Sequence, residues 1–336
     1  MLVKTCQKIG ILKIENEKNR GKKEKMIYNL MKIVRGNFMA KTEFEEFIEN
    51  DIKNQKGISH PVKASMLECL LVKKTPCTNL HPNENDEFSV SEIGPSYKII
   101  SEYESKFRQN LKFRLPVYMD PLTVEKIRPR GYLILNGHHR WAAAMRAGLK
   151  KVPIKIVNLA QESDIKKILE KSKHDKRVTL DLDEVVFRPD DYPYLEKMPR
   201  TLLNFKFKNR LRLGIPALFY FLSKNGYDIW VYSANYYSID DIKKFFRCYS
   251  VNVDGIITGA SKKKKSASSR TASMEQMIAN KYSETLHIDN DMILLTRKNS
   301  GSFEEYEIKS EPAEWSKTAM SIIGEIEKHE KKTEAE

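Results

Sequence analysis

The sequence predicts an α/β protein with two folded domains, the second of which is built on a Rossmann-like parallel sheet. From residue 178 onward, short apolar strands alternate with amphipathic helices, and this alternation is typical of a parallel sheet flanked by helices. Between residues 60 and 160, strands and helices follow a less regular order, which indicates a compact α+β unit. A chain of 336 residues is also long enough for two hydrophobic cores.

Changes of composition divide the chain into three parts. Residues 1–58 are rich in Lys, Glu and Asn, and they predict a basic helical appendage with helices over 26–34 and 41–52. A polar break near residue 172 separates the α+β unit, residues 60–160, from the parallel-sheet domain, residues 172–325.

Local patterns predict the elements of the α+β unit. Helical periodicity over 140–147 stops at Gly148, a residue type that commonly follows the last turn of a helix. The complete expected order is an apolar run at 66–72, a turn-rich loop at 80–87, a helix at 96–107, strands at 115–119 and 132–135, the helix at 140–147 and a strand at 152–157.

The parallel-sheet domain follows a helical connector predicted at 161–173. Gly226 is a helix stop that leads into the second strand, and the segment after Trp315 predicts one amphipathic helix. The expected strands lie at 178–181, 228–232, 255–257 and 285–288, and the expected helices between them lie at 215–224, 240–248 and 273–281.

The charge of the chain is strongly positive, with 59 Lys and Arg against 45 Asp and Glu. The excess gathers in three basic runs, 18–25, 206–212 and 262–265. Such runs favour a polyanionic partner such as nucleic acid, although a solvated, lysine-rich surface explains them equally well.

The cysteines and the hydropathy indicate a soluble, cytoplasmic protein. The four cysteines have no Cys-x-x-Cys spacing, so the sequence supports neither a zinc site nor a disulfide framework. No apolar run approaches the ~20 residues that cross a bilayer, and we expect no membrane association.

Polar residues stand at or just after the predicted carboxyl ends of the parallel strands, where ligands collect in such sheets. They are Asp181 and Asp183 after the first strand, Ser233 after the second, Lys262–Lys265 after the third, and Asp289 and Asp291 after the fourth. A carboxylate that attacks a phosphate needs a cation to screen the like charges, and Mg²⁺ prefers carboxylates, waters and substrate oxygens. The set therefore predicts magnesium-dependent phosphoryl chemistry.

The run Asp181-Leu-Asp183-Glu-Val185 resembles the Asp-x-Asp-x-Thr/Val signature of haloacid-dehalogenase-type phosphohydrolases. The resemblance covers about residues 174–320 and implies a domain with a small cap. It implies that Asp181 is the nucleophile that forms an aspartyl phosphate and that Asp183 is the general acid and base. Ser233 and a lysine would hold the phosphoryl oxygens, and Mg²⁺ would be bound by Asp181, the backbone carbonyl of Asp183, and Asp289.

Two assignments within this resemblance stay open. Either Asp291 or Asn290 takes the outer metal role, because Asn290 stands where many members have an aspartate. The lysine is one of Lys262–Lys265, with Lys265 preferred and Arg270 as an alternative. The segments that would form a cap are short, which favours a bulky substrate or a site covered by the other domain.

A second motif, Leu135-Asn-Gly-His-His-Arg-Trp-Ala-Ala-Ala144, joins a strand to a helix. Gly137 permits a tight turn that leaves helix-start amides facing an anion. His138, His139 and Arg140 add donors suited to phosphate oxygens. Alternatively, the two histidines cap the helix and satisfy polar groups of the core.

This motif resembles the ParB/sulfiredoxin-type domain, and in particular members with Asp-Gly-His-His-Arg, some of which are free-serine kinases. The resemblance covers about residues 65–160 and implies binding of ATP, ADP or CTP with phosphates at Gly137–Arg140. Glu84 or Glu87 would take the place of the catalytic glutamate. Asn136 replaces the kinase aspartate, and His138 stands where sulfiredoxins have their cysteine, so kinase activity is doubtful and reductase activity is disfavoured.

The leading hypothesis is a Mg²⁺-dependent phosphatase whose N-terminal domain binds a nucleotide. Its phosphorylated substrate is a small metabolite or a nucleic-acid end. The alternatives are a nucleic-acid-binding, nucleotide-switched ParB-like protein with an accessory phosphatase domain, and a scaffold in which both folds are only interaction surfaces. The sequence leaves the oligomeric state open.

Overall fold

The computed structural model describes residues 43–90, 93–199, 209–260, 269–298 and 303–333. The chain separates into two compact units, residues 1–54 and 55–336. Helix α2 (Glu43–Gln55) belongs to the first unit except for its last residue, and it confirms the expected helix at 41–52 and buries Ile48. The helix expected at 26–34 lies outside the described residues. Within the described part of the chain, no helix has both the length and the apolar character required to cross a membrane.

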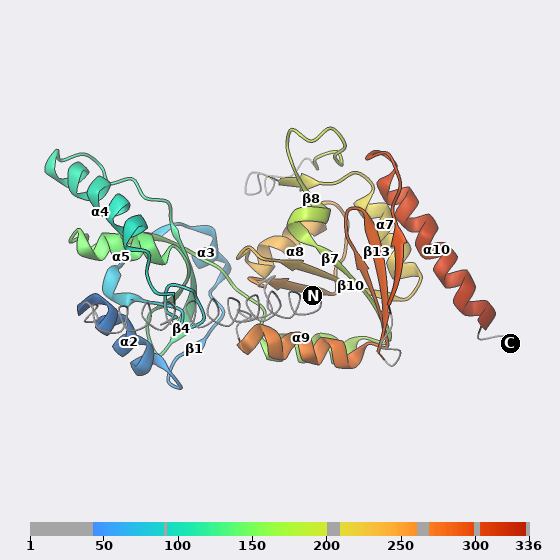
Figure 1. Cartoon of the computed structure of the whole chain (residues 1–336), viewed down its shortest axis with the longest axis horizontal. Coiled ribbons are helices and arrows are strands. Elements are labelled where there is room, and N and C mark those ends of the chain that lie inside the picture. Colours follow the sequence, from blue (N-terminus) through green and yellow to red (C-terminus); the bar gives the residue numbers. More distant parts are fainter. Residues whose placement is uncertain (1–42, 91–92, 200–208, 261–268, 299–302, 334–336) are drawn as a thin grey trace, which may run out of the picture. The chain divides into compact units, whose positions relative to one another are not determined.

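The second unit contains two six-stranded sheets, each with its own helices (Figure 1). Along its main path, the first sheet has the order β2-β6-β4-β5-β3, and β1 pairs with β4. Its elements in chain order are β1 (His60–Pro61), α3 (Met66–Leu70), β2 (Lys73–Pro76), η1 (Cys77–Asn79), β3 (Leu80–His81), α4 (Tyr97–Lys112), β4 (Leu122–Arg128), β5 (Tyr132–Asn136), α5 (His138–Arg146) and β6 (Lys151–Ile156).

Helices α4 and α5 pack against each other, and α5 buries the indole of Trp141 and three successive alanines. The alanines have no bulk beyond Cβ, so they permit close packing. The strand expected at 115–119 is wrong, because these residues have no regular structure. Pro116 has no amide to donate to a sheet. The strand forms instead at β4, where apolar residues repeatedly face the core.

The second sheet has the order β11-β10-β7-β12-β13-β14. Strands β11, β10, β7 and β12 run parallel, and β13 and β14 are antiparallel additions. The elements are α6 (Glu162–Lys171), β7 (Lys176–Asp181), β8 (Phe187–Pro189), β9 (Asn209–Leu211), α7 (Ile215–Lys224), β10 (Tyr227–Ser233), α8 (Ile239–Cys248), β11 (Gly255–Thr258), α9 (Ser269–Lys281), β12 (Glu284–Ile288), β13 (Met292–Arg297), β14 (Phe303–Glu307) and α10 (Trp315–Thr333).

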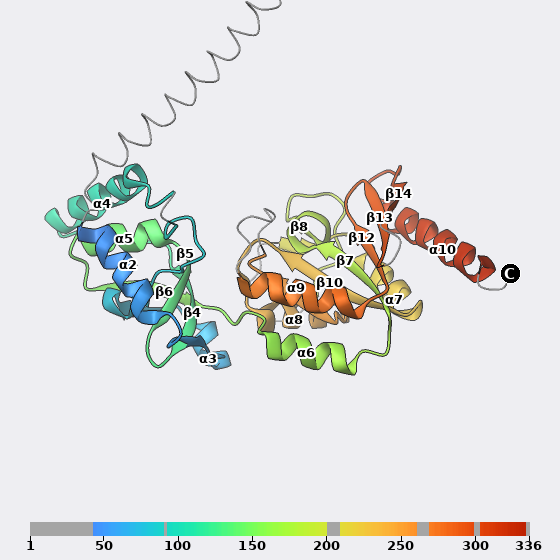
Figure 2. The ribbon, with the colours of Figure 1, turned by 60° about the horizontal axis from the view of Figure 1, so that its bottom comes forward.

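Alternate residues of the central strands face opposite sides of this sheet. Val178, Leu180 and Val231 join one core with residues of α7, α8 and α10. Trp230 belongs to a second core with residues of α6 and α9, and these two helices lie side by side (Figure 2). The predicted mixed α/β architecture is therefore confirmed at the level of its parallel strands and covering helices.

Two features near the end of β7 were not predicted. Residues Leu182–Val186 form a single π-helical turn. The chain then enters a two-stranded hairpin, in which β8 pairs with β9. This turn directly follows Asp181, and its backbone amides hold that carboxylate.

Candidate active site and candidate nucleotide site

Asp181 ends the central parallel strand β7, and its carboxylate is fixed by the turn that follows. Its Oδ1 accepts hydrogen bonds from the backbone amides of Asp183 and Glu184, each at 2.8 Å. A carboxylate that caps a helical turn in this way satisfies two amides that have no partner inside the turn. The local fold therefore restricts the orientation of the predicted nucleophile.

Asp183 points toward the end of β10. Its Oδ2 accepts a hydrogen bond from the Ser233 hydroxyl at 2.5 Å, and its Oδ1 accepts one from the Tyr237 hydroxyl at 2.7 Å. Ser233 is buried, and its Oγ also accepts the Asn235 amide at 2.9 Å. Burial, together with the bond to Asp183 and its charge, raises the pKa of Tyr237 above its usual range. Tyr237 therefore remains a neutral donor at physiological pH.

The loop after β12 places Asp289 and Asn290 in different environments. The Asp289 carboxylate accepts a hydrogen bond from the backbone amide of Asn290 at 2.7 Å. Arg188 and Arg212, from the two sides of the hairpin, both donate to Oδ1 of Asn290, with Arg212 at 3.0 Å. Burial, followed by the charge of Arg188, lowers the pKa of Arg212 to about 10. Asn290 therefore joins two guanidinium groups.

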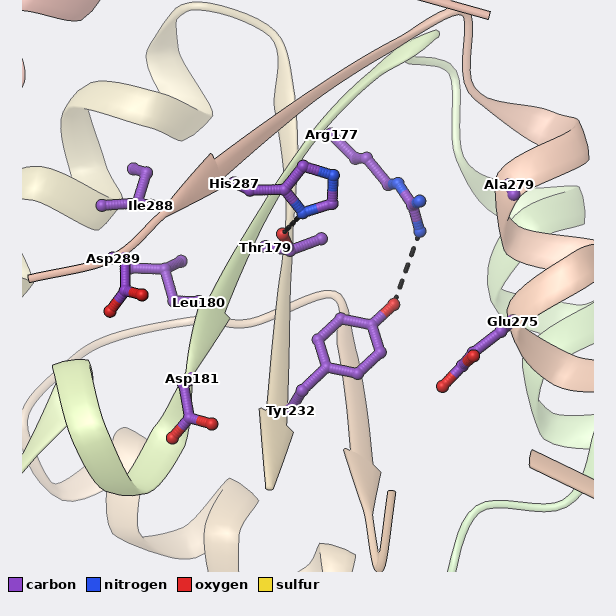
Figure 3. Close-up of a pocket in the computed structure, with 10 residues that line it drawn as sticks. All are labelled: Arg177, Thr179, Leu180, Asp181, Tyr232, Glu275, Ala279, His287, Ile288 and Asp289. Atoms are coloured by element: carbon purple, nitrogen blue, oxygen red, sulfur yellow. Dashed lines mark hydrogen bonds between the residues drawn. The ribbon is translucent and has the colours of Figure 1, made fainter. Parts of the chain in front are cut away.

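A pocket of about 660 Å³ lies beside the end of β7 (Figure 3). Asp181 and Asp289 line it at the carboxyl ends of their strands, and Glu275 faces it from α9. Arg177, Thr179, Leu180, Tyr232, Ala279, His287 and Ile288 complete the lining. The structure thus brings together the two predicted carboxylates of neighbouring strands, Asp181 and Asp289.

The remaining predicted active-site residues have other positions. Asp183 and Ser233 bond to each other and do not line this pocket. Asp291 also lies outside the pocket lining, and its charge acts on Arg212. Lys265 and its neighbours at 262–264 lie outside the described residues.

Sequence reasoning missed the polar residues that line the pocket behind Asp181. Arg177, Thr179 and Asp181 alternate along β7. Three polar side chains on one face of a strand are a pattern from which this lining could have been predicted. Thr179 Oγ1 lies 2.6 Å from His287 Nδ1. Burial and the nearby charge of Arg177 lower the pKa of His287 to about 4, so its ring is neutral near pH 7.

The donor chemistry of this site fits Mg²⁺. Among the described residues, no group of three or more His, Cys, Asp or Glu side chains is arranged to hold a metal. Mg²⁺ commonly binds one or two protein carboxylates and completes its shell with waters and substrate oxygens. Asp181 and Asp289 are such oxygen donors at adjacent strand ends.

The second candidate site lies where β5 leads into α5. Gly137 precedes α5 with φ of 102°, a left-handed conformation that favours glycine. A Cβ at this position would lie 2.6 Å from Cδ2 of Leu122 and 2.9 Å from Nη2 of Arg140. Arg140 in turn donates to the carbonyl of Asp120 at 2.7 Å. The glycine therefore allows the guanidinium to lie against the start of its own helix.

The two histidines of the motif hold the loop before α4. His138 is buried, its Nε2 accepts the Asn83 amide at 3.2 Å, and its ring stacks on Phe88. Nε2 of His139 accepts the Ser96 amide at 3.0 Å. Each ring thus uses Nε2 to accept a backbone amide of this loop, as expected if the histidines satisfy polar groups of the fold. Donation to a phosphate from the other nitrogen, Nδ1, stays a prediction.

Burial lowers the pKa of His138 to about 4, against an opposing effect from Asp86, whose Oδ1 lies 3.4 Å from Nδ1. Burial also lowers the pKa of His139. Glu84 and Glu87 are exposed in the same loop. Arg140 lines a smaller pocket of about 320 Å³ together with Asp120 and residues of α4.

Comparison with known proteins gives a family match for part of the chain. Residues 114–172 match the ParB N-terminal domain, so the match covers residues 114–160 of the expected unit at 60–160 and continues to residue 172. Among solved structures, the chain is similar to the C-terminally truncated chromosome-partitioning protein ParB from Caulobacter crescentus complexed with CTP-γ-S. That similarity has 25% identity and a TM-score of 0.22, and it covers 27% of this chain and 46% of that chain. The chain thus spans less than half the length of that ParB. No curated protein matches.

Proposed function

We propose that the second sheet carries a Mg²⁺-dependent phosphohydrolase site that works through an aspartyl phosphate on Asp181. The observation that carries the proposal is the position of Asp181. It ends the central parallel strand with its carboxylate fixed by two amides, and it shares a pocket with Asp289 of the neighbouring strand. Carboxyl ends of parallel strands are the usual ligand sites of such sheets.

The proposed reaction has two displacements at phosphorus. A carboxylate oxygen of Asp181 attacks the phosphoryl group, and the bond to the leaving-group oxygen breaks while Asp183 supplies a proton to that oxygen. Asp183 then takes a proton from a water molecule, which attacks the aspartyl phosphate and releases inorganic phosphate. When bound by Asp181, Asp289 and the backbone carbonyl of Asp183, Mg²⁺ would screen the negative charges that meet at the start.

Ser233 and Tyr237 support this scheme as partners of Asp183. Their two hydroxyls donate to the two oxygens of this carboxylate. On substrate binding, Ser233 would exchange its bond to Asp183 for a phosphoryl oxygen, and the freed oxygen of Asp183 would turn to the leaving group. The lysine that neutralises the phosphoryl charge is proposed to be Lys265.

The ParB-like part is proposed to bind the phosphates of a nucleotide such as ATP, ADP or CTP at Gly137–Arg140. The match at residues 114–172 supports this assignment. The left-handed turn at Gly137 and the guanidinium of Arg140 beside it supply the local geometry. A second candidate function is that of a nucleotide-switched, nucleic-acid-binding protein, which the ParB match and the net charge of +14 favour.

Release of inorganic phosphate from a panel of phosphomonoesters with Mg²⁺ tests the hydrolase proposal. Asp181→Asn should abolish release, because an amide is a poor nucleophile. The matched control is Asp191→Asn, since Asp191 is an exposed aspartate of the nearby hairpin loop. Phosphate release by Asp181→Asn at the wild-type rate would refute the proposal. For the second function, DNA affinity should fall steeply with salt.

A further inference from the structure

The active-site pocket extends away from Asp181 along the face of the sheet. Arg177, Thr179 and Asp181 alternate on β7, so their side chains leave the same face of the strand. His287 and Asp289 alternate in the same way at the end of β12. Asp181 and Asp289 lie at one end of this polar stripe and Arg177 at the other (Figure 3). The pocket therefore offers room and polar contacts beyond the site of phosphoryl transfer.

Arg177 is a buried cation, and its partners among the described residues are neutral. Only 9% of its surface is exposed. Its Nε donates to Thr285 at 2.9 Å, its Nη1 donates to the Tyr232 hydroxyl at 3.4 Å, and the guanidinium lies 5.6 Å from the centre of the Tyr282 ring. Within the described parts of the chain, it forms no ion pair. A buried charge without a counterion is costly, so an anionic ligand would stabilise it.

The Tyr232 side chain links the guanidinium to the phosphoryl end of the pocket. Arg177 stands near the start of β7 and donates through Nε to Thr285, its register partner on β12. The Tyr232 ring extends to the guanidinium from the register of Asp181, at the other end of the strand. Figure 3 shows the guanidinium and the Tyr232 hydroxyl meeting inside the pocket. A ligand whose phosphoryl group is at Asp181 would thus present the far end of its leaving group to Arg177.

Other charges limit what this end of the pocket can hold. Glu275 faces it from α9 but is exposed and forms no ion pair with Arg177. Asp181 and Asp289 lie at the opposite end of the pocket, where the phosphoryl group would bind. A volume of about 660 Å³ is that of a small-molecule site rather than a groove for a nucleic-acid duplex.

We propose that the substrate is a small phosphomonoester whose leaving group carries a second anionic group, a carboxylate or a phosphate, and that Arg177 binds this group. The proposal rests on the hydrolase function and names its substrate class. Arg177 is then a specificity-determining residue, and its planar fork suits both kinds of anion. The neutral hydroxyl of Tyr232 adds a second donor from the adjacent strand.

Binding of phosphonates tests this proposal without requiring turnover, because their carbon–phosphorus bond is not the ester bond that the site would cleave. Three probes are compared by calorimetry with Mg²⁺: butylphosphonate, its analogue with a terminal carboxylate, and its analogue with a second terminal phosphonate. Wild type should bind at least one doubly anionic analogue roughly tenfold to a hundredfold more tightly than butylphosphonate. The two analogues separate carboxylate from phosphate recognition.

Arg177→Gln should remove that preference while affinity for butylphosphonate stays within about twofold. Arg177→Lys should keep part of the preference, because lysine retains the positive charge but lacks the planar pair of N–H donors of a guanidinium. The control is Arg247→Gln, which removes one exposed positive charge from α8 and should change nothing. Thermal unfolding of each variant establishes that it is folded, and Tyr232→Phe, which keeps the ring, should weaken the preference without removing it.

The outcomes separate this inference from the hydrolase proposal. Equal binding of all three probes by wild type, or a preference that survives in Arg177→Gln, overturns the inference even if hydrolysis depends on Asp181. A preference that Arg177→Gln removes supports the anion pocket. If such binding occurs while no phosphomonoester is hydrolysed, the hydrolase proposal fails and the anion pocket remains.

Discussion

The Ser233 hydroxyl donates a hydrogen bond to Oδ2 of Asp183 at 2.5 Å, so the predicted phosphate-binding hydroxyl and the predicted general acid contact each other. Tyr237 holds the other oxygen of the same carboxylate at 2.7 Å. Without substrate, Asp183 is therefore fixed from two sides. The proposed catalytic role of Asp183 requires that one of these bonds be exchanged while the other keeps the carboxylate in place.

Tyr237→Phe removes one of these two bonds and keeps the ring that packs against Phe187. Because Tyr237 positions Asp183 and does not contact the phosphoryl group in this scheme, kcat should fall roughly tenfold with little change in KM. The free energy of unfolding should fall by only about 1 kcal/mol, as is typical for one hydrogen bond. Steady-state kinetics and urea unfolding measure the two effects. Tyr220→Phe, a substitution of an exposed tyrosine, is the control. An unchanged kcat in Tyr237→Phe would show that Tyr237 has no role in positioning Asp183.

Asn290→Asp should stabilise the protein, because the new carboxylate would lie between the guanidinium groups of Arg188 and Arg212. We expect a gain of about 1–3 kcal/mol in the free energy of unfolding at pH 7, since hydrogen bonds between charged groups are stronger than those to an amide. Lowering the pH to about 3 should remove roughly half of the gain, because a carboxylate that is paired in the folded state loses its stabilising effect progressively between about pH 5 and pH 1.

Urea unfolding at the two pH values measures this effect. Asn252→Asp adds the same charge at an exposed position and should leave stability nearly unchanged. A loss of stability in Asn290→Asp at pH 7 would contradict the arrangement of the two arginines around this side chain.

His138 should make the region around α5 less stable in acid. Its pKa is lowered to about 4 in the folded state, so the ring resists protonation there. The unfolded chain takes up a proton near pH 6.5, and stability is therefore complete above that pH and declines as the pH falls toward 4. Between pH 7 and pH 5 the expected loss is about 2 kcal/mol.

Hydrogen exchange of peptides from residues 138–146 measures this loss locally. His138→Gln keeps an acceptor for the backbone amide of Asn83 but does not titrate. This variant should be less stable than wild type at pH 7, and hydrogen exchange in this region should depend less on pH. His60→Gln, at an exposed histidine, should keep the wild-type pH dependence. An identical pH dependence in His138→Gln would show that this ring is not the titrating group.

The sequence predicted the parallel strands and their helices because their patterns are local. The helix expected at 215–224 coincides with α7, and Asp181 and Ser233 end their strands as expected. Strand β14 was missed because it is largely exposed and has no apolar alternation that distinguishes it from a loop. The strand misplaced at 115–119 shows the same limit, since an apolar composition outweighed the effect of Pro116.

The candidate site was predictable only in part, because only some of its features follow from local patterns in the sequence. Carboxylates at strand ends follow from topology, so Asp181 and Asp289 were found. The pairing of Asn290 with Arg188 and Arg212 joins segments distant in sequence, and no local pattern indicates it. His138 and His139 have the residue types expected at a phosphate site, but their nitrogens accept amides of a loop whose path the sequence does not specify.

Gly137→Ala tests the nucleotide site through two separable effects. Any Cβ at φ of 102° strains the backbone. This Cβ would also lie 2.9 Å from Nη2 of Arg140 and 2.6 Å from Leu122, so the guanidinium has to move. We expect the free energy of unfolding to fall by about 2–3 kcal/mol, and calorimetric affinity for CTP, ATP or ADP to fall at least roughly tenfold because Arg140 is displaced.

Gly148→Ala separates the backbone strain from the contact with Arg140. Gly148 follows the same helix with φ of 79°, but a Cβ there would meet nothing within 4 Å. This variant should therefore lose about 1–2 kcal/mol from strain alone and keep wild-type nucleotide affinity. If both variants lose affinity equally, global destabilisation explains the loss. If Gly137→Ala binds nucleotide as wild type does, the phosphates do not bind at the start of α5, because the guanidinium cannot keep its position beside a Cβ at residue 137.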